Sequence, residues 1–263
     1  MKKADGENAI ISLERGLDLL RAFQNQGEAL GIHDLMRITS LPKVTVARLV
    51  YTLTSMGYLR QEHFHGRYSL ADRVIDLGTS VIANLAVCRI AAPILQELAE
   101  RFKMSAALGA GDRADMIYLA YCEGEEMAAL RMRTGALVPM HTTAIGRAYL
   151  SALTPEHRNA SMEYLRKTSA NIDEVVKRLE ESAVEIEAKG FCTSLGDWRP
   201  EVYSAAAPLI IGRSEPVLAI NCGASRYGLS AENFHDEVGP ALRDAAGRIR
   251  NTMADMQLGM YGP

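Results

Sequence analysis

Cysteine is scarce in this chain, and none of its four copies lies in a C-x-x-C pair. Cys88, Cys122, Cys192 and Cys222 are scattered along 263 residues. This spacing argues against a structural zinc module and a disulfide-stapled secreted fold, so we expect four free thiols in a reducing compartment. The sequence also lacks a glycine-rich phosphate loop and a cluster with metal-ligand spacing, so we expect neither a metal nor a cofactor.

Long apolar runs are absent as well. The chain has no stretch of about 18 apolar residues, which is the length that a membrane-spanning helix needs. Its first residues are polar and no apolar signal core follows them, so we expect a cytoplasmic protein without membrane contact. With 48% hydrophobic and 23% charged residues, the composition is ordinary for a globular protein of one large domain or two modest ones.

A strong excess of positive charge, the usual mark of nucleic-acid binding, is also missing. The net charge is −3, and residues 1–72 hold nine Lys and Arg against eight Asp and Glu. The sign of this small excess at the front of the chain suits DNA binding, but its size predicts little. Any DNA-binding function must therefore be inferred from the pattern of residues.

The first seventy residues have the pattern of a winged helix-turn-helix. We expect three helices and then two short strands, in this order: residues 12–25, 32–39, 42–56, 58–61 and 67–70. Ser12 is the expected N-cap of the first helix, and Pro42 is the expected first residue of the third. Three helices with a tight turn before the third, followed by a hairpin, are typical of this DNA-binding fold.

The expected third helix has two distinct faces. Its core face carries apolar residues at i, i+3, i+4 and i+7: Val46, Leu49, Val50 and Leu53. A third helix of this kind lies in the major groove, and a wing arginine reaches a phosphate. We therefore expect five residues to contact DNA: Lys43, Thr45, Arg48, Thr52 and Arg67. The alternative is a small helical domain whose basic residues are merely solvated.

A helix is expected to link this domain to a second one. Asp72 can cap it, and Val74, Val81 and Leu85 lie on one apolar stripe that serves either as a dimer seam or as a simple connection. Pro93 is expected to begin the first helix of the next domain. The expected boundaries are residues 1–72 for the DNA-binding domain, 73–90 for the linker and 91–263 for the second domain.

Strands, then helices, then strands again follow in the second domain. The expected strands are residues 105–109, 116–121, 128–132, 191–195, 203–211 and 217–222. The expected helices are residues 143–152, 155–166, 173–189 and 230–256. Because no helix separates each pair of strands, we predict an antiparallel sheet with flanking helices and an α+β fold class.

One helix start in this domain suggests chemistry. A loop runs directly into the helix at residues 143–152, with Thr142 or Thr143 as its N-cap. The amides of Ala144 and Ile145 would then lack intrahelical partners, and the positive end of the helix dipole would favour a carboxylate there. Since every helix has such an end, local features alone favour an ordinary helix start.

The chain as a whole resembles the IclR family of bacterial transcription regulators. Four segments carry the resemblance: residues 12–17 (SLERGL), 41–49 (LPKVTVARL), 67–70 (RYSL) and 139–148 (PMHTTAIGRA). The resemblance covers nearly all of the sequence. It implies a winged helix-turn-helix, a linker helix and a GAF-like sensor domain, in a homodimer or homotetramer that binds double-stranded operator DNA and a small carboxylate effector.

The resemblance also implies an effector site. By position in the family's pattern, nine residues are expected to bind the effector: Leu130, Val138, Ala144, Ile145, Ser194, Val202, Ser204, Asn221 and Gly223. Asn221 and Gly223 stand where the family often has serine or another small residue. The segment 190–201 lacks the acid-rich run that is common in the family and carries the single tryptophan, Trp198. The identity of the effector therefore cannot be copied from a relative.

Two other functions compete with that of an effector-responsive transcription regulator. An enzyme would need His141 as base, Thr142 or Thr143 as nucleophile and Asp197 as the residue that orients the base. Nothing in the sequence indicates that these residues meet, and we do not expect an enzyme. The second alternative is a DNA-binding protein whose C-terminal domain only oligomerises, because an apolar linker stripe would look the same in both cases.

Overall fold

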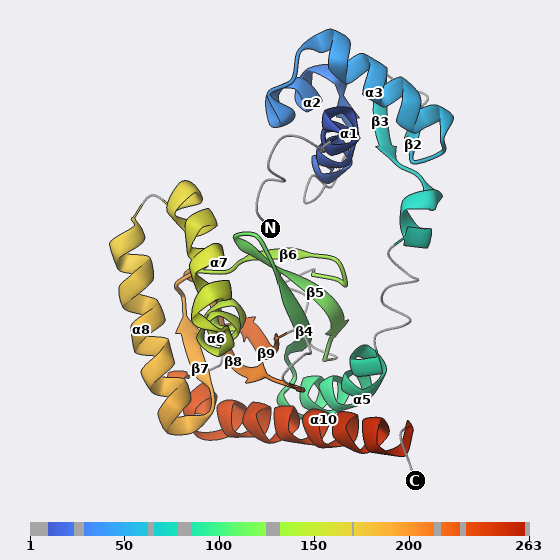
Figure 1. The fold of residues 1–263 in the computed structure, drawn as a ribbon. Helices are drawn as coiled ribbons and strands as arrows, with labels where there is room; N and C mark the ends of the chain where they lie inside the picture. The colour runs from blue at the N-terminus through green and yellow to red at the C-terminus, as the bar shows by residue number, and fades with distance from the viewer. Residues whose placement is uncertain are drawn as a thin grey trace. The chain divides into compact units, whose positions relative to one another are not determined.

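The computed structural model divides the chain into two compact units, residues 1–84 and 85–263 (Figure 1). The described residues are 10–23, 29–62, 66–77, 86–124, 132–169, 171–212, 217–226 and 230–260. Within these ranges, no helix is both long and apolar enough to cross a membrane. Each unit is described below by itself.

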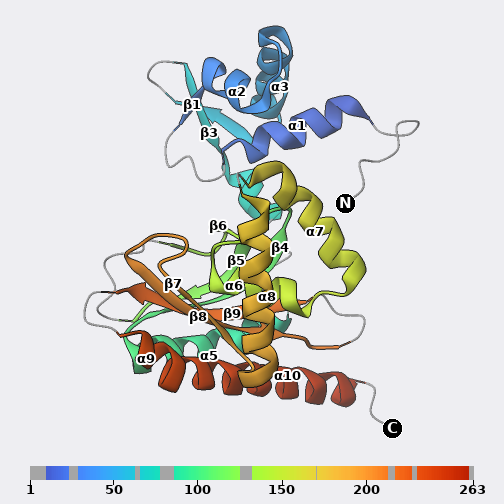
Figure 2. The same ribbon diagram turned by 90° about the vertical axis from the view of Figure 1, so that its left-hand side faces the viewer.

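The N-terminal unit is a winged helix-turn-helix, as predicted. It contains α1 (Ile11–Arg21), α2 (Ile32–Thr39), α3 (Lys43–Ser55), β1 (Leu30–Gly31), β2 (Leu59–Gln61) and β3 (Arg67–Leu70). The strands form an antiparallel sheet in the order β1-β3-β2, and the short β1 was not expected. The three helices pack beside this sheet (Figures 1 and 2).

Two helix starts differ from the prediction. Ser12 lies inside α1 and does not cap it, because the amides of Leu13 and Glu14 already bond to the carbonyl of Ile10. Pro42 is the N-cap of α3 and not its first residue, so the helix begins at Lys43, one residue later than expected. Its carbonyl accepts the amide of Val46 at 3.0 Å, so the first bond of the helix begins at the proline.

A small apolar core fixes the orientation of α3. Leu19, Leu35, Val46 and Val50 are buried together and join α1, α2 and α3. The turn between α2 and α3 is tight because Ser40 adopts a left-handed conformation with φ of 56°. Since Val46 and Val50 point inward, the opposite face of α3 must point to solvent.

The C-terminal unit contains a six-stranded antiparallel sheet in the order β6-β5-β4-β9-β8-β7. Its strands are β4 (Ser105–Asp112), β5 (Asp115–Cys122), β6 (Leu137–Pro139), β7 (Cys192–Leu195), β8 (Val202–Leu209) and β9 (Leu218–Ser225). Its helical elements are α5 (Ala86–Phe102), α6 (Ala144–Ala152), α7 (Pro155–Thr168), α8 (Ile172–Lys189), α9 (Ala231–Asn233), the π-helix η1 (Phe234–Val238) and α10 (Gly239–Met260). The α+β prediction is confirmed.

The helices cover both faces of this sheet. Helices α5 and α10 lie side by side on one face, and α6 packs on the other, with α7 and α8 beyond it (Figures 1 and 2). The sheet face under α6 is therefore enclosed. The start of α6 lies over this face, and side chains from four strands point toward it.

Pro93 does not begin a helix, so that prediction is wrong. It lies within α5, on the exposed side, while Ile94, Leu95 and Leu98 are buried. An internal proline costs a helix about 3 kcal/mol or more. Burial of one large aliphatic side chain contributes about 1.5–3 kcal/mol, so several such residues on α5 offset the proline.

Part of the predicted linker and one predicted strand lie outside the described residues. Residues 72–77 are helical, and Asp72 is the first residue of this helix and not its cap. Positions 78–85 and 125–131 are not described, and the second gap includes Leu130 and most of the strand expected at residues 128–132.

Candidate functional site

The outer face of α3 is exposed and polar. Lys43, Arg48 and Thr52 are exposed, whereas Thr45 lies on the flank of the helix and is half-buried. Among the described residues, no ion pair involves the side chain of Lys43 or Arg48. Both cations can therefore reach a DNA duplex without first losing a protein partner.

Two of the predicted DNA contacts are already engaged within the unit. The hydroxyl of Thr52 donates to the carbonyl of Arg48 at 2.9 Å, so only its oxygen lone pairs are available to a base. Arg67 on β3 lies 3.9 Å from Asp34 Oδ2, and the same oxygen accepts the amide of Gly31 at 3.1 Å. A phosphate would have to compete with Asp34 for the Arg67 guanidinium.

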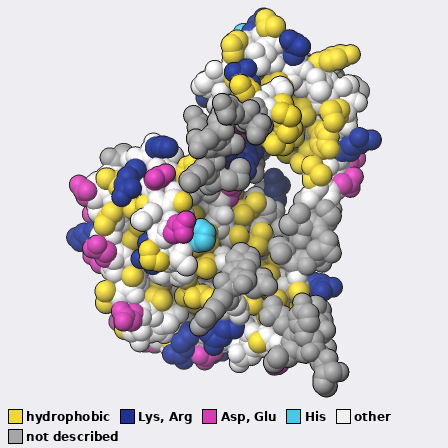
Figure 3. Space-filling model, in the orientation of Figure 1, with side chains coloured by type: hydrophobic (Ala, Val, Ile, Leu, Met, Phe, Trp, Pro, Cys, Tyr) yellow, Lys and Arg dark blue, Asp and Glu magenta, His cyan; other side chains and the backbone are white. Residues whose placement is uncertain are grey.

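Tyr51 is a further exposed residue on this face that was not expected from the sequence. Hydrophobic side chains are visible on the surface of the N-terminal unit in Figure 3. On α3, Val44 is 72% exposed and Tyr51 is 77% exposed. Together with Arg48 they follow the spacing i, i+4, i+7, which could have identified Tyr51. An aromatic ring with this exposure can contact a thymine methyl group or a sugar in the groove.

A second site is indicated by where the C-terminal unit buries its polar side chains. Six of the seven buried polar or charged residues in the described part of the chain lie at the start of α6 or on the sheet face beneath it: Ser105, Thr143, Arg147, Ser194, Ser204 and Asn221. Buried polar groups need hydrogen-bond partners, so their concentration in one place needs a reason.

The strand register brings these side chains onto one face. Ser194 pairs with Ser204, Ser204 pairs with Gly223, and Gly223 pairs with Ser105, which forms a row across β7, β8, β9 and β4. Asn221 lies two residues from Gly223 and therefore on the same face. A Cβ placed on Gly223 would lie 3.5 Å from Ser204 Cβ and 3.8 Å from Asn221 Nδ2.

The start of α6 is anchored beside this row. Thr143 is the N-cap, and its hydroxyl donates to the Pro139 carbonyl at 2.6 Å and accepts the Gly146 amide at 3.4 Å. A Cβ on Gly146 would lie 2.0 Å from the Met140 carbonyl oxygen, so only glycine allows this close packing of the loop on the helix.

Two backbone donors at this helix start lack a partner. Among the described residues, no hydrogen bond involves the amide of Ala144 or Ile145. These amides occupy the first turn of the helix, where the positive end of the dipole favours an anion. The prediction that Thr142 or Thr143 caps the helix is confirmed for Thr143.

Arg147 connects the helix start to the loop after β7. Its side chain is buried, and one guanidinium nitrogen donates to the Thr142 carbonyl at 3.1 Å and pairs with Asp197. The Ser194 hydroxyl donates to the same carbonyl at 2.9 Å. This loop also carries Trp198, whose ring packs on the hydrophobic core. No role for Arg147 was expected from the sequence.

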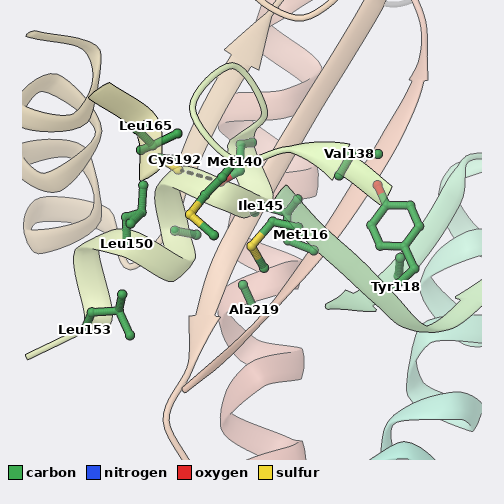
Figure 4. Close-up of a cluster of buried hydrophobic side chains, with 14 of the residues drawn as sticks. Met116, Tyr118, Val138, Met140, Ile145, Leu150, Leu153, Leu165, Cys192 and Ala219 are labelled. Atoms are coloured by element: carbon green, nitrogen blue, oxygen red, sulfur yellow. Dashed lines mark hydrogen bonds between the residues drawn. The ribbon is translucent and has the colours of Figure 1, made fainter. Parts of the chain in front are cut away.

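The core beneath the site is apolar. Figure 4 shows Met116, Met140, Ile145, Leu150 and other core side chains converging between α6 and the sheet. The Cys192 thiol donates to the Ala144 carbonyl at 3.5 Å, and burial raises the pKa of this thiol to about 12. Such a thiol stays protonated and packs as a small apolar group.

Several side-chain atoms at this site are buried without a hydrogen-bond partner in the described structure. They are His141 Nδ1, Thr142 Oγ1, Arg147 Nε and Asn221 Oδ1. Leaving such an atom unpaired costs about 1–3 kcal/mol. Three of these atoms belong to residues just before or within the start of α6, where the two free backbone amides also lie, and the fourth is on β9.

The pKa of His141 is lowered by its surroundings. Burial, and then the nearby charge of Arg147, lowers the pKa of this imidazole below its ordinary value of 6.5. Below pH 6.5 the unfolded chain takes up a proton that the folded state resists, so stability is lost as the pH falls. We expect the wild-type protein to lose more stability between pH 7.5 and 5.5 than the variant His141→Gln.

Urea unfolding of both proteins at the two pH values measures this difference. Other titrating groups contribute equally to the two proteins, so the comparison isolates His141. Equal losses for wild type and variant would contradict the lowered pKa.

The structure brings most of the predicted effector residues together. Val138, Ser194, Val202, Ser204, Asn221 and Gly223 lie on the α6 face of the sheet, and Ala144 and Ile145 begin the helix above it. All eight are buried. Leu130 is outside the described residues.

A separate cavity of about 190 Å³ lies between α6, α7 and α8. Its walls include Leu150, Met162, Leu179 and Arg158. The Arg158 guanidinium donates to the carbonyls of Leu150 and Ser151 at 2.9 and 2.7 Å and so caps the end of α6. This cavity lies at the opposite end of α6 from the free amides and does not belong to the site.

Comparisons with known proteins agree with this arrangement. The family described as "Bacterial transcriptional regulator IclR C-terminal" matches residues 79–251, and "IclR helix-turn-helix domain" matches residues 12–63. The chain is 31% identical over 252 residues to the HTH-type transcriptional regulator TsaQ1/TsaQ2 of Comamonas testosteroni, covering 94% of this chain and 90% of that protein.

Solved structures of IclR proteins share the fold of this chain. An IclR family transcriptional regulator from Brucella abortus is 32% identical, with a TM-score of 0.85 and 96% of each chain covered. An IclR homologue from Microbacterium hydrocarbonoxydans, complexed with 4-hydroxybenzoate, is 20% identical, with a TM-score of 0.72, 93% of this chain and 99% of that chain covered.

These relatives are transcriptional regulators and not enzymes. In the described structure Asp197 pairs with Arg147 and His141 Nδ1 has no partner, so no hydrogen bond joins the base and the orienting residue that catalysis would need.

Proposed function

The chain belongs to the IclR family of bacterial transcriptional regulators, and from this premise we propose that a small organic acid bound at the start of α6 controls operator binding by α3. The observation that carries the proposal is the pair of free amides at Ala144 and Ile145, beside a buried polar row. The acid's carboxylate accepts hydrogen bonds from these amides, at the positive end of the helix dipole.

On the DNA side, α3 enters the major groove. Arg48 contacts base edges. Lys43 and Thr45 contact the DNA near the N-terminal end of α3, and the Thr52 hydroxyl accepts a hydrogen bond from a base. Arg67 exchanges Asp34 for a phosphate. The exposure of α3 supports this assignment, as does the lack of ion pairs at Lys43 and Arg48 among the residues that the structure describes.

On the effector side, the site takes an acid of limited size. The 4-hydroxybenzoate complex of the Microbacterium homologue supports an organic acid as the class of ligand. Ser194, Ser204, Asn221 and Gly223 form the floor, and Val138 and Val202 form an apolar wall. The family resemblance adds Leu130, which lies outside the described residues. Val138 and Val202 are buried on this face, in agreement with such a wall.

The regulator acts in the cytoplasm as a homodimer or homotetramer on double-stranded DNA. Paired half-sites require two recognition helices at a fixed spacing, which a dimer supplies. We propose that residues 1–72 are the DNA-binding domain, residues 73–90 the linker helix and residues 91–263 the GAF-like effector domain.

The effector site is tested by thermal shift with a panel of small mono- and dicarboxylates. An acid at 100 times its Kd stabilises the folded protein by about 2.7 kcal/mol. We expect Ser204→Leu to abolish this stabilisation, because the larger side chain fills the floor of the site, and to leave DNA binding intact.

Loss of both activities in Ser204→Leu would indicate misfolding, and Ser204→Ala then serves as the milder variant. If no acid stabilises the wild-type protein, the result contradicts the effector site. It would then favour the alternative in which the C-terminal domain only oligomerises.

A further inference from the structure

The cavity between α6, α7 and α8 has no part in the regulation proposed above. Its volume is about 190 Å³, and it lies where α7 and α8 pack outside α6 (Figure 2). Pockets for drug-sized ligands enclose roughly 300–1,000 Å³, so this cavity has room for a smaller molecule.

Most of the cavity lining is apolar. Leu150 on α6 and Met162 on α7 are buried, and α8 contributes three less buried side chains, Val176, Leu179 and Ala183. An apolar group that enters the cavity removes its own surface and that of these side chains from water. The lining therefore favours an aliphatic or aromatic group as the inner part of a ligand.

A cation lines the same cavity. The half-buried Arg158 side chain donates from Nε to the Leu150 carbonyl at 2.9 Å and from Nη2 to the Ser151 carbonyl at 2.7 Å. A guanidinium has five N–H donors. Among the described residues, Arg158 has no further hydrogen bond and no ion pair, so the remaining donors are available to an anionic group.

An anion lines the cavity as well. Glu180 on α8 is exposed, and within the described part of the chain its carboxylate has no hydrogen bond and no ion pair, including none with Arg158. By contrast, Arg178 on the same helix is paired with both Glu174 and Glu181. A small cavity with one unpaired charge of each sign is complementary to a molecule that carries both charges.

We propose that this cavity is a second ligand site, which binds an α-amino acid with an apolar side chain. The ligand's carboxylate accepts hydrogen bonds from Arg158, its ammonium group donates to Glu180, and its side chain packs on Leu150, Met162 and Leu179. An acid without the ammonium group brings a negative charge to Glu180, and an amine without the carboxylate leaves Arg158 unpaired. The small volume requires the two charges of the ligand to lie close together, as they do on an α-carbon.

Isothermal titration calorimetry of the full-length protein tests the proposal. L-Leucine, L-methionine and L-phenylalanine are each compared with the acid that lacks the ammonium group and the amine that lacks the carboxylate. L-Alanine is the control for the apolar side chain. We expect at least one of the three amino acids to bind, and its two analogues and alanine to bind about tenfold or more weakly, because each lacks one set of contacts.

The same titrations are repeated with Ser204→Leu, because the acid analogues can also bind at the start of α6. This substitution fills the proposed effector site and lies outside the cavity. We therefore expect Ser204→Leu to bind the amino acid with wild-type affinity.

Three variants of α8 assign the binding to the cavity. Glu180→Gln removes one charge from an exposed side chain and is expected to weaken amino-acid binding about tenfold, since it removes a charge-assisted hydrogen bond. Ala183→Leu extends an apolar side chain into the cavity and is expected to abolish binding. Glu187→Gln removes the same charge from an exposed position outside the cavity and is expected to keep the affinity.

The outcomes for this cavity are distinct from those for the effector site. If none of the three amino acids binds, or if each binds no better than its analogues, the second site is contradicted and the acid site at α6 is unaffected. Binding that survives in both Glu180→Gln and Ala183→Leu would also overturn it. So would a lower molar mass of Ala183→Leu in light scattering without amino-acid binding by the wild type, which would assign the cavity to contact with a second copy of the chain.

Discussion

Replacing Arg48 with alanine weakens specific DNA binding by about 1–3 kcal/mol, which is roughly a five- to 150-fold loss of affinity. Arg48 lies on the solvent face of α3, and no ion pair in the described structure occupies its guanidinium. A guanidinium that bonds a guanine in two places loses both contacts on truncation. The loss is measured by fluorescence anisotropy on a duplex selected from a random library by the wild-type protein.

Two further variants serve as controls for the effect of Arg48→Ala on DNA affinity. Arg250→Ala removes the same charge from an exposed position on α10 and is expected to leave affinity unchanged. Lys43→Ala is expected to weaken binding to all duplexes alike and to reduce the salt slope by about 1, as loss of a phosphate contact does. Equal effects of Arg48→Ala and Arg250→Ala, or a flat salt response of the wild type, would contradict α3 as the DNA-binding face.

Breaking the pair between Arg147 and Asp197 destabilises the C-terminal unit by about 3 kcal/mol. The Arg147 side chain is 4% exposed and that of Asp197 is 27% exposed. Removal of Asp197 therefore leaves a buried guanidinium without its counter-ion. We expect the single variants Arg147→Met and Asp197→Leu to lower the free energy of unfolding, measured by urea denaturation. The double variant should recover much of the loss.

An exposed pair is the control for this prediction. Glu97 on α5 and Arg248 on α10 form two hydrogen bonds at 3.1 and 2.9 Å, but both side chains are more than half exposed. Solvent screens such a pair, so Arg248→Met should have little effect on stability. If Arg147→Met and Arg248→Met cost the same, then the buried pair does not hold the loop after β7 to the start of α6.

The N-terminal unit could be predicted well because its signals are local. The residues Val46 and Val50 on one side of α3, and Arg48 on the other, follow from helical spacing alone. The predicted helix at residues 32–39 coincides with α2. Tyr51 was not predicted because only polar residues were considered as DNA contacts. It is an exposed aromatic residue on the same face of α3 as Arg48.

The C-terminal site could not be derived from spacing. Ser194, Ser204 and Asn221 come from three strands, and only the sheet register brings them to one face. The family resemblance predicted these positions, but it gave no role to Arg147, whose partner Asp197 is 50 residues away. The predicted helix start at Pro93 was wrong because burial of the apolar face of α5 offsets the cost of a proline inside the helix.

In the proposed mechanism, acid binding at α6 changes DNA binding at α3. The most direct measurement is the affinity of the wild-type protein for its selected duplex, with and without the acid that stabilises the protein most. We predict a change of about fivefold or more, since coupling energies between two sites are typically 1–3 kcal/mol, and we expect Ser204→Leu to abolish it. An unchanged DNA affinity at saturating acid would contradict the claim.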